Sequence, residues 1–128
     1  MTGKGTLLYG IEHDGRTHYD FEIRIPVMAD VYTALDQAER VHGNSDSGAG
    51  DLYYRMALMA LVLTRLGELP AQDITPELLL SGLLSEDYER LNEVIAALKK
   101  KRRNANAGDT DCASPSLPSD NTASAKNG

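Results

Sequence analysis

Alternating apolar and polar residues open the chain. Leu7, Tyr9 and Ile11 form one alternating arm, and every second residue from Thr17 to Ile25 is threonine, aromatic or aliphatic. A period of two predicts strands, so we expect a β-hairpin over residues 6–25. Proline has no amide donor for a β-ladder, and Pro26 therefore predicts the end of the second arm.

The turn between the arms decides which side chains share a face. A two-residue loop at Asp14-Gly15 would set apolar Ile11 opposite His18. We therefore predict a three-residue loop, residues 13–15, with Gly15 in the left-handed conformation. The face made by Tyr9, Tyr19 and Phe21 would then pack on the helices, with His18 in solvent. The predicted pairs are Ile11 with Thr17, Tyr9 with Tyr19, Leu7 with Phe21, and Glu12 with Arg16.

Helical spacing replaces the alternation after Pro26. The periodicity of apolar residues predicts a first helix from about Ala29 to Val41, followed by a polar loop, His42 to Gly50. A second helix is predicted from Asp51 to Leu66, with Gly67 as its C-cap. Its middle is apolar on every side, which predicts burial on most sides.

Two further helix starts follow in the C-terminal half. Thr75-Pro76-Glu77 combines a capping hydroxyl, a proline in the first turn and an acid that complements the helix dipole. Ser85-Glu86-Asp87 begins a last helix that ends in the basic run Lys99–Arg103. The apolar stripe of this helix is Leu84, Tyr88, Leu91, Ile95 and Leu98, with Val94 beside it.

The pattern stops at Asn104. Beyond it Leu117 is the one large aliphatic residue in a run of Asn, Ala, Ser, Asp, Gly and Pro. Such a segment cannot bury enough apolar surface to offset its chain entropy, which predicts a disordered tail over residues 104–128. The expected fold is α+β: a domain over residues 1–103, in which an N-terminal β-hairpin packs on a small bundle of about four helices.

Charge and composition narrow the class of function. The formal net charge is −6 and the sequence pI is about 4.9, which disfavours a general nucleic-acid binder because phosphates would be repelled. Cys112 has no second cysteine with which to form a disulfide. The N-terminus has no signal-peptide core, and the apolar run from Met56 to Leu63 is too short to span a bilayer. We therefore expect a cytoplasmic protein that does not enter a membrane.

Candidate catalytic and metal-binding residues are few. His13, His18 and His42 do not have the spacing of zinc ligands, and the acids Glu86, Asp87 and Glu89 belong to a helix start, where acids are expected. No phosphate-binding loop or nucleophile motif is present in the sequence. We expect a protein that is not an enzyme, with no catalytic, cofactor-binding or metal-binding residues and no cofactor.

Protein binding is the function that the residues favour. Methionine in an apolar helix is usually core filler, but it is also common on surfaces that receive a partner helix. The basic run Lys99–Arg103 is a solvated helix end or, alternatively, a contact for an acidic partner or nucleic acid. The predicted partner-binding residues are Met56, Met59, Leu91, Val94, Ile95 and Leu98.

The order of these features resembles a known family. A hairpin leads into Arg24-Ile25-Pro26, and Asp30 follows near a helix start. Next come YYRMALMALVLTRLG (Tyr53 to Gly67) and LPAQDITPELLLSGLLSEDYERLNEVIAALKKK (Leu69 to Lys101). The chain thereby resembles the tail assembly chaperones of Mu-like contractile-tail bacteriophages and prophages over about residues 6–103. The block from Tyr53 to Leu84 is the most specific part, whereas the loop at residues 42–50 is longer and more polar than the family pattern.

The resemblance implies a non-enzymatic role in tail morphogenesis in the bacterial cytoplasm. The implied partners are the tape-measure protein, which the chaperone would keep soluble, and the tail-tube protein; self-association is a further expectation. It also implies a second, longer product made by ribosomal frameshifting, for which the codons of Lys99–Lys101 would be the slippery site. Two other functions stay open: a generic protein-binding adaptor, and a small DNA-binding regulator that uses the basic end of the last helix.

Overall fold

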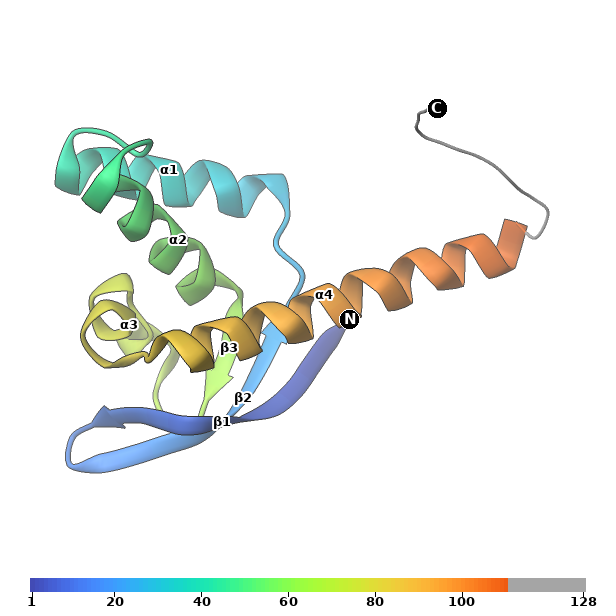
Figure 1. Cartoon of the computed structure of the whole chain (residues 1–128), viewed down its shortest axis with the longest axis horizontal. Helices are drawn as coiled ribbons and strands as arrows, with labels where there is room; N and C mark the ends of the chain where they lie inside the picture. Colours follow the sequence, from blue (N-terminus) through green and yellow to red (C-terminus); the bar gives the residue numbers. More distant parts are fainter. Residues whose placement is uncertain (111–128) are drawn as a thin grey trace. The chain divides into compact units, whose positions relative to one another are not determined.

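The computed structural model describes residues 1–110 and divides the chain into two units, Met1–Leu98 and the part from Lys99 onward. The first unit has the predicted α+β class. Its sheet is antiparallel with the strand order β1-β2-β3, and Figure 1 shows the helices on one side of it. The elements are β1 (Thr2–His13), β2 (Arg16–Arg24), α1 (Met28–His42), α2 (Gly48–Val62), β3 (Leu63–Leu66), η1 (Ala71–Asp73), α3 (Pro76–Gly82) and α4 (Ser85–Thr110).

The hairpin is confirmed, but its predicted turn is wrong. Asp14 and Gly15 have φ angles of 55° and 75° and form a two-residue turn, so that Ile11 lies opposite His18. Asp-Gly suits this turn because both positions need positive φ, and such turns match the twist of the strands. His18 is buried rather than in solvent, so the prediction for this residue is wrong. The pairing of Ile11 with His18 is tolerated because Nδ1 of the buried histidine accepts the backbone N–H of Glu68 at 3.3 Å.

A bulge in β1 changes the rest of the predicted register. The pairs Thr6–Asp20 and Ile11–His18 leave residues 7–10 opposite Tyr19 alone. Leu7 and Ile11 consequently both face the core, whereas Tyr9 and Tyr19 are exposed. The predicted pairs of Leu7 with Phe21, Tyr9 with Tyr19, Ile11 with Thr17 and Glu12 with Arg16 are therefore wrong, as is the predicted packing face; only Phe21 of that face is buried.

The second predicted helix is shorter than expected at its C-terminal end. α2 ends at Val62, and residues 63–66 form β3, which pairs with β2 through Phe21–Leu66 and Ile23–Leu63. Both leucines of β3 are buried, so the edge of the sheet gains two core side chains. Gly67 has a φ of 57° and follows this strand rather than capping a helix.

The core lies between the sheet and three helices. Its buried members come from β1, β2, β3, α2, α3 and α4, while α1 packs on α2 through small residues, Ala34, Ala38 and Ala57, with Tyr53. The main cluster consists of Leu7, Ile11, Phe21, Ile23, Met56, Met59, Val62, Leu63, Leu66, Ile74, Leu79, Leu91, Ile95 and Leu98.

Three predicted helices are confirmed. α1 begins and ends within one residue of its predicted bounds, and Gly43 closes it with a φ of 79°. α3 begins as its start signal predicts, because the Thr75 hydroxyl accepts the backbone N–H of Leu78 at 3.2 Å. α4 begins at Ser85 and continues past the predicted boundary at Asn104 to Thr110. The rest of the predicted disordered tail, 111–128, lies outside the described residues.

Candidate protein-binding groove

A groove of about 210 Å³ opens between α2, α3 and the start of α4. Its lining is mostly aliphatic, with one charged side chain, one serine and one tyrosine. The lining residues are Leu52, Arg55, Met56, Leu79, Leu80, Leu83, Ser85 and Tyr88. Small apolar clefts between helices are typical places for a protein to receive an apolar segment of a partner.

Helical spacing places these side chains together. Leu52, Arg55 and Met56 are three and four residues apart and therefore lie on one face of α2. Met56 is buried and joins the groove to the core. Leu79 anchors α3 in the same core, so the groove has a packed floor rather than a mobile one.

A hydrogen bond holds α2 and α3 at the spacing that forms the groove. The Tyr53 hydroxyl donates to Oε2 of Glu77 at 2.6 Å. Burial first, and then the hydrogen bond to this carboxylate, raises the pKa of Tyr53 to about 12. Tyr53 therefore stays protonated at neutral pH and remains a donor that links the two helices.

The rim of the groove exposes leucine. Leu52 and Leu80 line the groove and retain 49% and 43% of their surface. Covering these exposed leucines and the apolar floor with a partner would be favourable, because apolar surface is removed from water.

The charge in the groove comes from Arg55. Its Nε lies 3.0 Å from Oδ2 of Asp51, one helical turn earlier on α2. This pair is partly exposed, so it contributes little to stability, but it fixes the direction of the guanidinium.

The structure separates the predicted partner-binding residues. Met56 lines the groove, whereas Met59, Leu91, Ile95 and Leu98 are buried in the core of the free protein. Val94 is half-buried, and the side chain lies beside Gly3 of β1. Contact with a partner stays a prediction for this set. Five aliphatic or aromatic lining residues are absent from the predicted partner-binding set, although the run of leucines after Thr75-Pro76 could have indicated an apolar surface. They are Leu52, Leu79, Leu80, Leu83 and Tyr88.

Asp87 has a different role from the one its position suggests. Its side chain is fully buried, and its carboxylate accepts the backbone N–H groups of Leu8, Tyr9 and Gly10 at 2.7, 3.0 and 3.1 Å. Nearby, Arg90 donates from Nε to the Thr6 carbonyl at 2.7 Å. The two α4 side chains thus satisfy backbone groups of β1 at its bulge, and these hydrogen bonds account for the burial of the acid.

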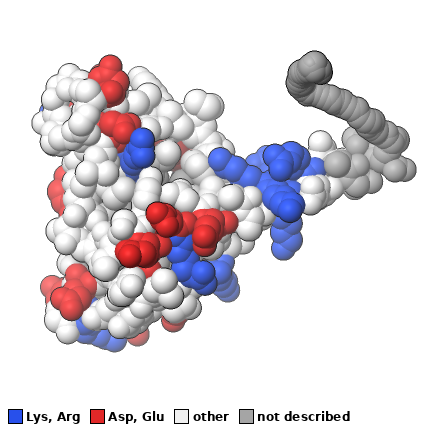
Figure 2. Space-filling view, in the orientation of Figure 1, with Lys and Arg blue, Asp and Glu red and all other residues white. Residues whose placement is uncertain are grey.

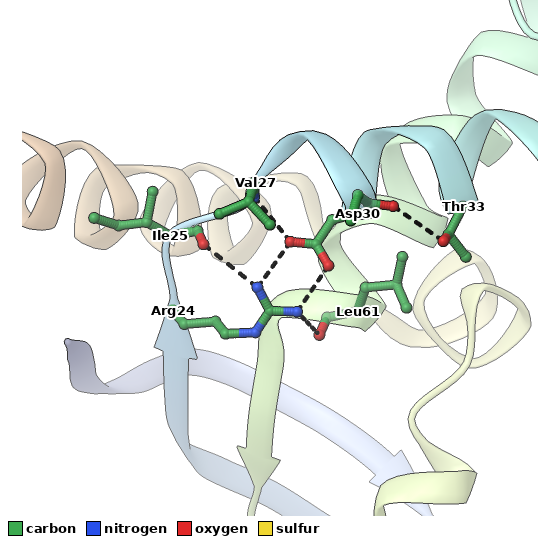
Figure 3. Close-up of polar contacts among 7 residues, drawn as sticks. Arg24, Ile25, Val27, Asp30, Thr33 and Leu61 are labelled. Atoms are coloured by element: carbon green, nitrogen blue, oxygen red, sulfur yellow. Dashed lines mark hydrogen bonds and ion pairs between the residues drawn. The ribbon is translucent and has the colours of Figure 1, made fainter.

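A second polar network joins β2, α1 and α2 (Figure 3). Arg24 donates from both terminal nitrogens to Asp30 at 2.7 and 2.8 Å, and also to the Leu61 carbonyl at 3.3 Å. Asp30 in turn accepts the backbone N–H of Val27 at 2.8 Å. The Arg24 hydrogen bond is the main cause that lowers the pKa of Asp30, and the same bond raises the pKa of Arg24.

The histidines lie in three separate places. His13 Nε2 is 3.4 Å from Asp14 and 3.5 Å from Asp73, and the His42 ring meets Tyr53 edge to face. Within residues 1–110, no group of three or more histidine, cysteine or acidic side chains is arranged to hold a metal ion. In the same part of the chain no helix has both the length and the apolarity needed to cross a membrane.

Acidic and basic side chains lie side by side on the first unit (Figure 2). Glu86, Glu89 and Glu93 are exposed on the part of α4 that belongs to the first unit. The basic run Lys99–Arg103 belongs to the second unit and is exposed along its whole length.

Comparisons of the chain with protein-family models, curated proteins and solved structures found no match.

Proposed function

We propose that this protein is a tail assembly chaperone of a contractile-tail bacteriophage, and that it acts without catalysis by binding an apolar helical segment of the tape-measure protein. The observation that carries the proposal is the groove between α2, α3 and α4, with exposed leucines around an apolar floor. The resemblance over residues 6–103 supplies the identity of the partner.

The lining of the groove favours a helix over an extended peptide. An extended segment must find partners for its backbone N–H and C=O groups, whereas a helix satisfies its own. The residues that line the groove come from three helices and from Leu83, which follows α3, and none of them belongs to a strand with which an extended peptide could pair. A helix with an apolar stripe can therefore occupy the groove without leaving buried polar groups unpaired.

Solubilisation follows from the same chemistry. A long tape-measure helix exposes apolar residues before tail assembly, and such surfaces lead to aggregation. A chaperone that covers part of this stripe lowers the exposed apolar area of both proteins. Leu52 and Leu80 would each lose exposed surface in that complex.

Co-expression with the tape-measure protein tests the proposal. The informative variants are Leu52→Asp and Leu80→Asp, because both side chains line the groove and are exposed, so that their replacement spares the core. Met28→Asp and Tyr32→Asp are matched controls: these side chains on α1 are 75% and 71% exposed and do not line the groove. Circular dichroism and thermal unfolding establish that each variant is folded.

The expected result is a difference between the two pairs. Wild-type protein and the α1 variants should raise the soluble fraction of the tape-measure protein, and the groove variants should lose most of this effect. Equal solubilisation by all four folded variants would exclude the groove as the binding site. If the wild-type protein binds the tape-measure protein no better than an unrelated protein of the same charge, the chaperone proposal fails and a generic adaptor is favoured.

A further inference from the structure

The groove also has a charge pattern that selects among apolar helices. This inference rests on the proposed function, because it concerns the occupant of the same groove. We propose that the bound helix carries a carboxylate beside its apolar stripe, and that Arg55 receives this carboxylate at the rim. Arg55 is thus a specificity-determining residue of the binding site.

The position of Arg55 supports this role. It lines the groove together with Leu52 and Met56, its neighbours on the same face of α2, and no acidic side chain belongs to the lining set. An apolar stripe that lies on Leu52 and Met56 therefore brings the flank of the partner helix to Arg55. A basic side chain at that point would face a guanidinium, and a neutral one would leave it without an added partner.

The contact with Asp51 orients the Arg55 guanidinium and leaves its two terminal nitrogens available for a second carboxylate. The pair uses Nε of the guanidinium, at 3.0 Å from the Asp51 carboxylate. Arginine has two further nitrogens that donate in the same plane, and together they fit a second carboxylate in a bidentate manner. The Asp51 contact thus reduces the conformational freedom that Arg55 would lose on binding, while its negative charge limits the strength of the added contact.

A second copy of this chain is the main alternative occupant. α1 exposes Met28 and Tyr32 one turn apart, with Asp36 one turn further along the helix. However, the Asp36 carboxylate is paired with Arg40 at 2.9 Å, so this surface would bring a second guanidinium toward Arg55 together with the acid. The observed charges favour a different protein whose carboxylate is free to meet Arg55.

The test uses defined peptides rather than an unidentified partner. Helical peptides of about 15 residues are displayed as a library with a fixed leucine stripe and with Glu, Gln or Lys varied at the flanking positions. The library is selected on the full-length wild-type protein, on Arg55→Gln and on Asp51→Asn. Arg40→Gln is the matched control, because it breaks the same kind of one-turn pair on α1, away from the groove. Leu80→Asp reports whether binding uses the groove.

Arg55→Gln and Asp51→Asn should change the glutamate preference in opposite directions. Wild-type protein and Arg40→Gln should enrich glutamate at one flanking position, with an affinity about two- to five-fold higher than the glutamine peptide. Arg55→Gln should remove this preference, and Asp51→Asn should increase it, because Arg55 then keeps its full charge for the peptide.

The remaining outcomes overturn the inference in distinguishable ways. One outcome is that peptides bind the wild-type protein but not Leu80→Asp, and yet show no preference for glutamate, or a preference that survives Arg55→Gln. Either result would refute the role of Arg55 and leave the groove as the binding site. A failure to obtain any peptide whose binding needs Leu80 would refute the proposed function as well. Sedimentation of the wild-type protein as an oligomer that Leu80→Asp converts to a monomer would identify a second copy as the occupant.

Discussion

At the scale of single residues, Asp87 shows how one buried carboxylate shapes a strand. The four-residue bulge of β1 leaves the N–H groups of Leu8, Tyr9 and Gly10 without partners in β2, and Asp87 accepts all three. Gly10 has a φ of 79°, and a Cβ there would lie 2.6 Å from Thr17 Cγ2, so glycine is required by both conformation and space. The bulge of β1 therefore depends on Asp87, although the two are far apart in the sequence.

Asp87→Asn should destabilise the protein strongly. The amide keeps one acceptor oxygen, but its NH₂ group would face N–H donors of the bulge, and a hydrogen bond to a charged acceptor contributes about 1.5–3 kcal/mol. We expect the free energy of unfolding to fall by at least about 3 kcal/mol in urea titrations. Glu86→Gln, one residue earlier and exposed, is the control and should change it by less than about 0.5 kcal/mol. Similar stabilities of the two variants would contradict the assigned role.

Tyr53 predicts a second, pH-dependent effect. Its pKa is raised to about 12 by burial and by Glu77, whereas the unfolded value is about 10. Its contribution to stability is therefore fully present below about pH 10 and is lost as the pH rises toward 12. Tyr53→Phe should cost about 1 kcal/mol at pH 7 through the lost hydrogen bond, and should make stability fall less steeply between pH 10 and 12. Parallel pH profiles of the two proteins would be inconsistent with the Tyr53–Glu77 contact.

At the scale of elements, the Arg24–Asp30 pair joins β2 to α1, which contribute to different core clusters, and it also reaches α2. β2 ends at Arg24, α1 begins with Asp30 in its first turn, and α2 ends near the Leu61 carbonyl that Arg24 also reaches (Figure 3). The connection from β2 to α1 is short and contains Pro26, so its direction depends on a few polar contacts. The pair therefore holds the start of α1 against the end of β2 and near the C-terminal end of α2.

Acid should weaken this connection first. The pKa of Asp30 is lowered in the folded protein, so its contribution to stability is present above the unfolded value of about 3.9 and is lost as the pH falls through the folded value. Asp30→Asn should lower the free energy of unfolding by about 1–3 kcal/mol at pH 7 and should reduce its decline below pH 4. Asp36→Asn removes an exposed pair with Arg40 and should leave both quantities nearly unchanged. Equal effects of the two substitutions in urea titrations at pH 7 and pH 3 would refute the assignment.

The elements also show what periodicity can predict. α1, α3 and α4 begin where spacing and capping residues indicated, because these signals are local. β3 was missed since Leu63–Leu66 continues an apolar run, and only its pairing with β2 distinguishes strand from helix. The bulge depends on Asp87, far along the chain, and could not be derived from the alternation of residues 6–25 alone.

At the scale of the whole molecule, the same limit applies to the candidate site. The sequence identifies the apolar positions of α2 and α4. It does not show that Leu91, Ile95 and Leu98 are buried in the core of the free protein. The exposed leucines of the groove, Leu52 and Leu80, can be identified only once α2, α3 and α4 are packed together. The frameshift at Lys99–Lys101 stays a prediction. It concerns a position directly after Leu98, where the first unit ends.

Truncation tests whether residues 1–103 are sufficient for stability and binding. In a chain that ends at Arg103, every buried core residue is retained, and the side chains of Lys99–Arg103 are exposed. We expect its free energy of unfolding to match that of the full chain within about 0.5 kcal/mol, and its solubilisation of the tape-measure protein to be retained. A chain that ends at Val94 lacks Ile95 and Leu98, whose burial in the core makes their loss worth about 2–5 kcal/mol each, so it should unfold at low urea or not fold at all. A chain ending at Arg103 that is folded but no longer solubilises the partner would show that residues beyond Arg103, rather than the groove alone, carry part of the binding.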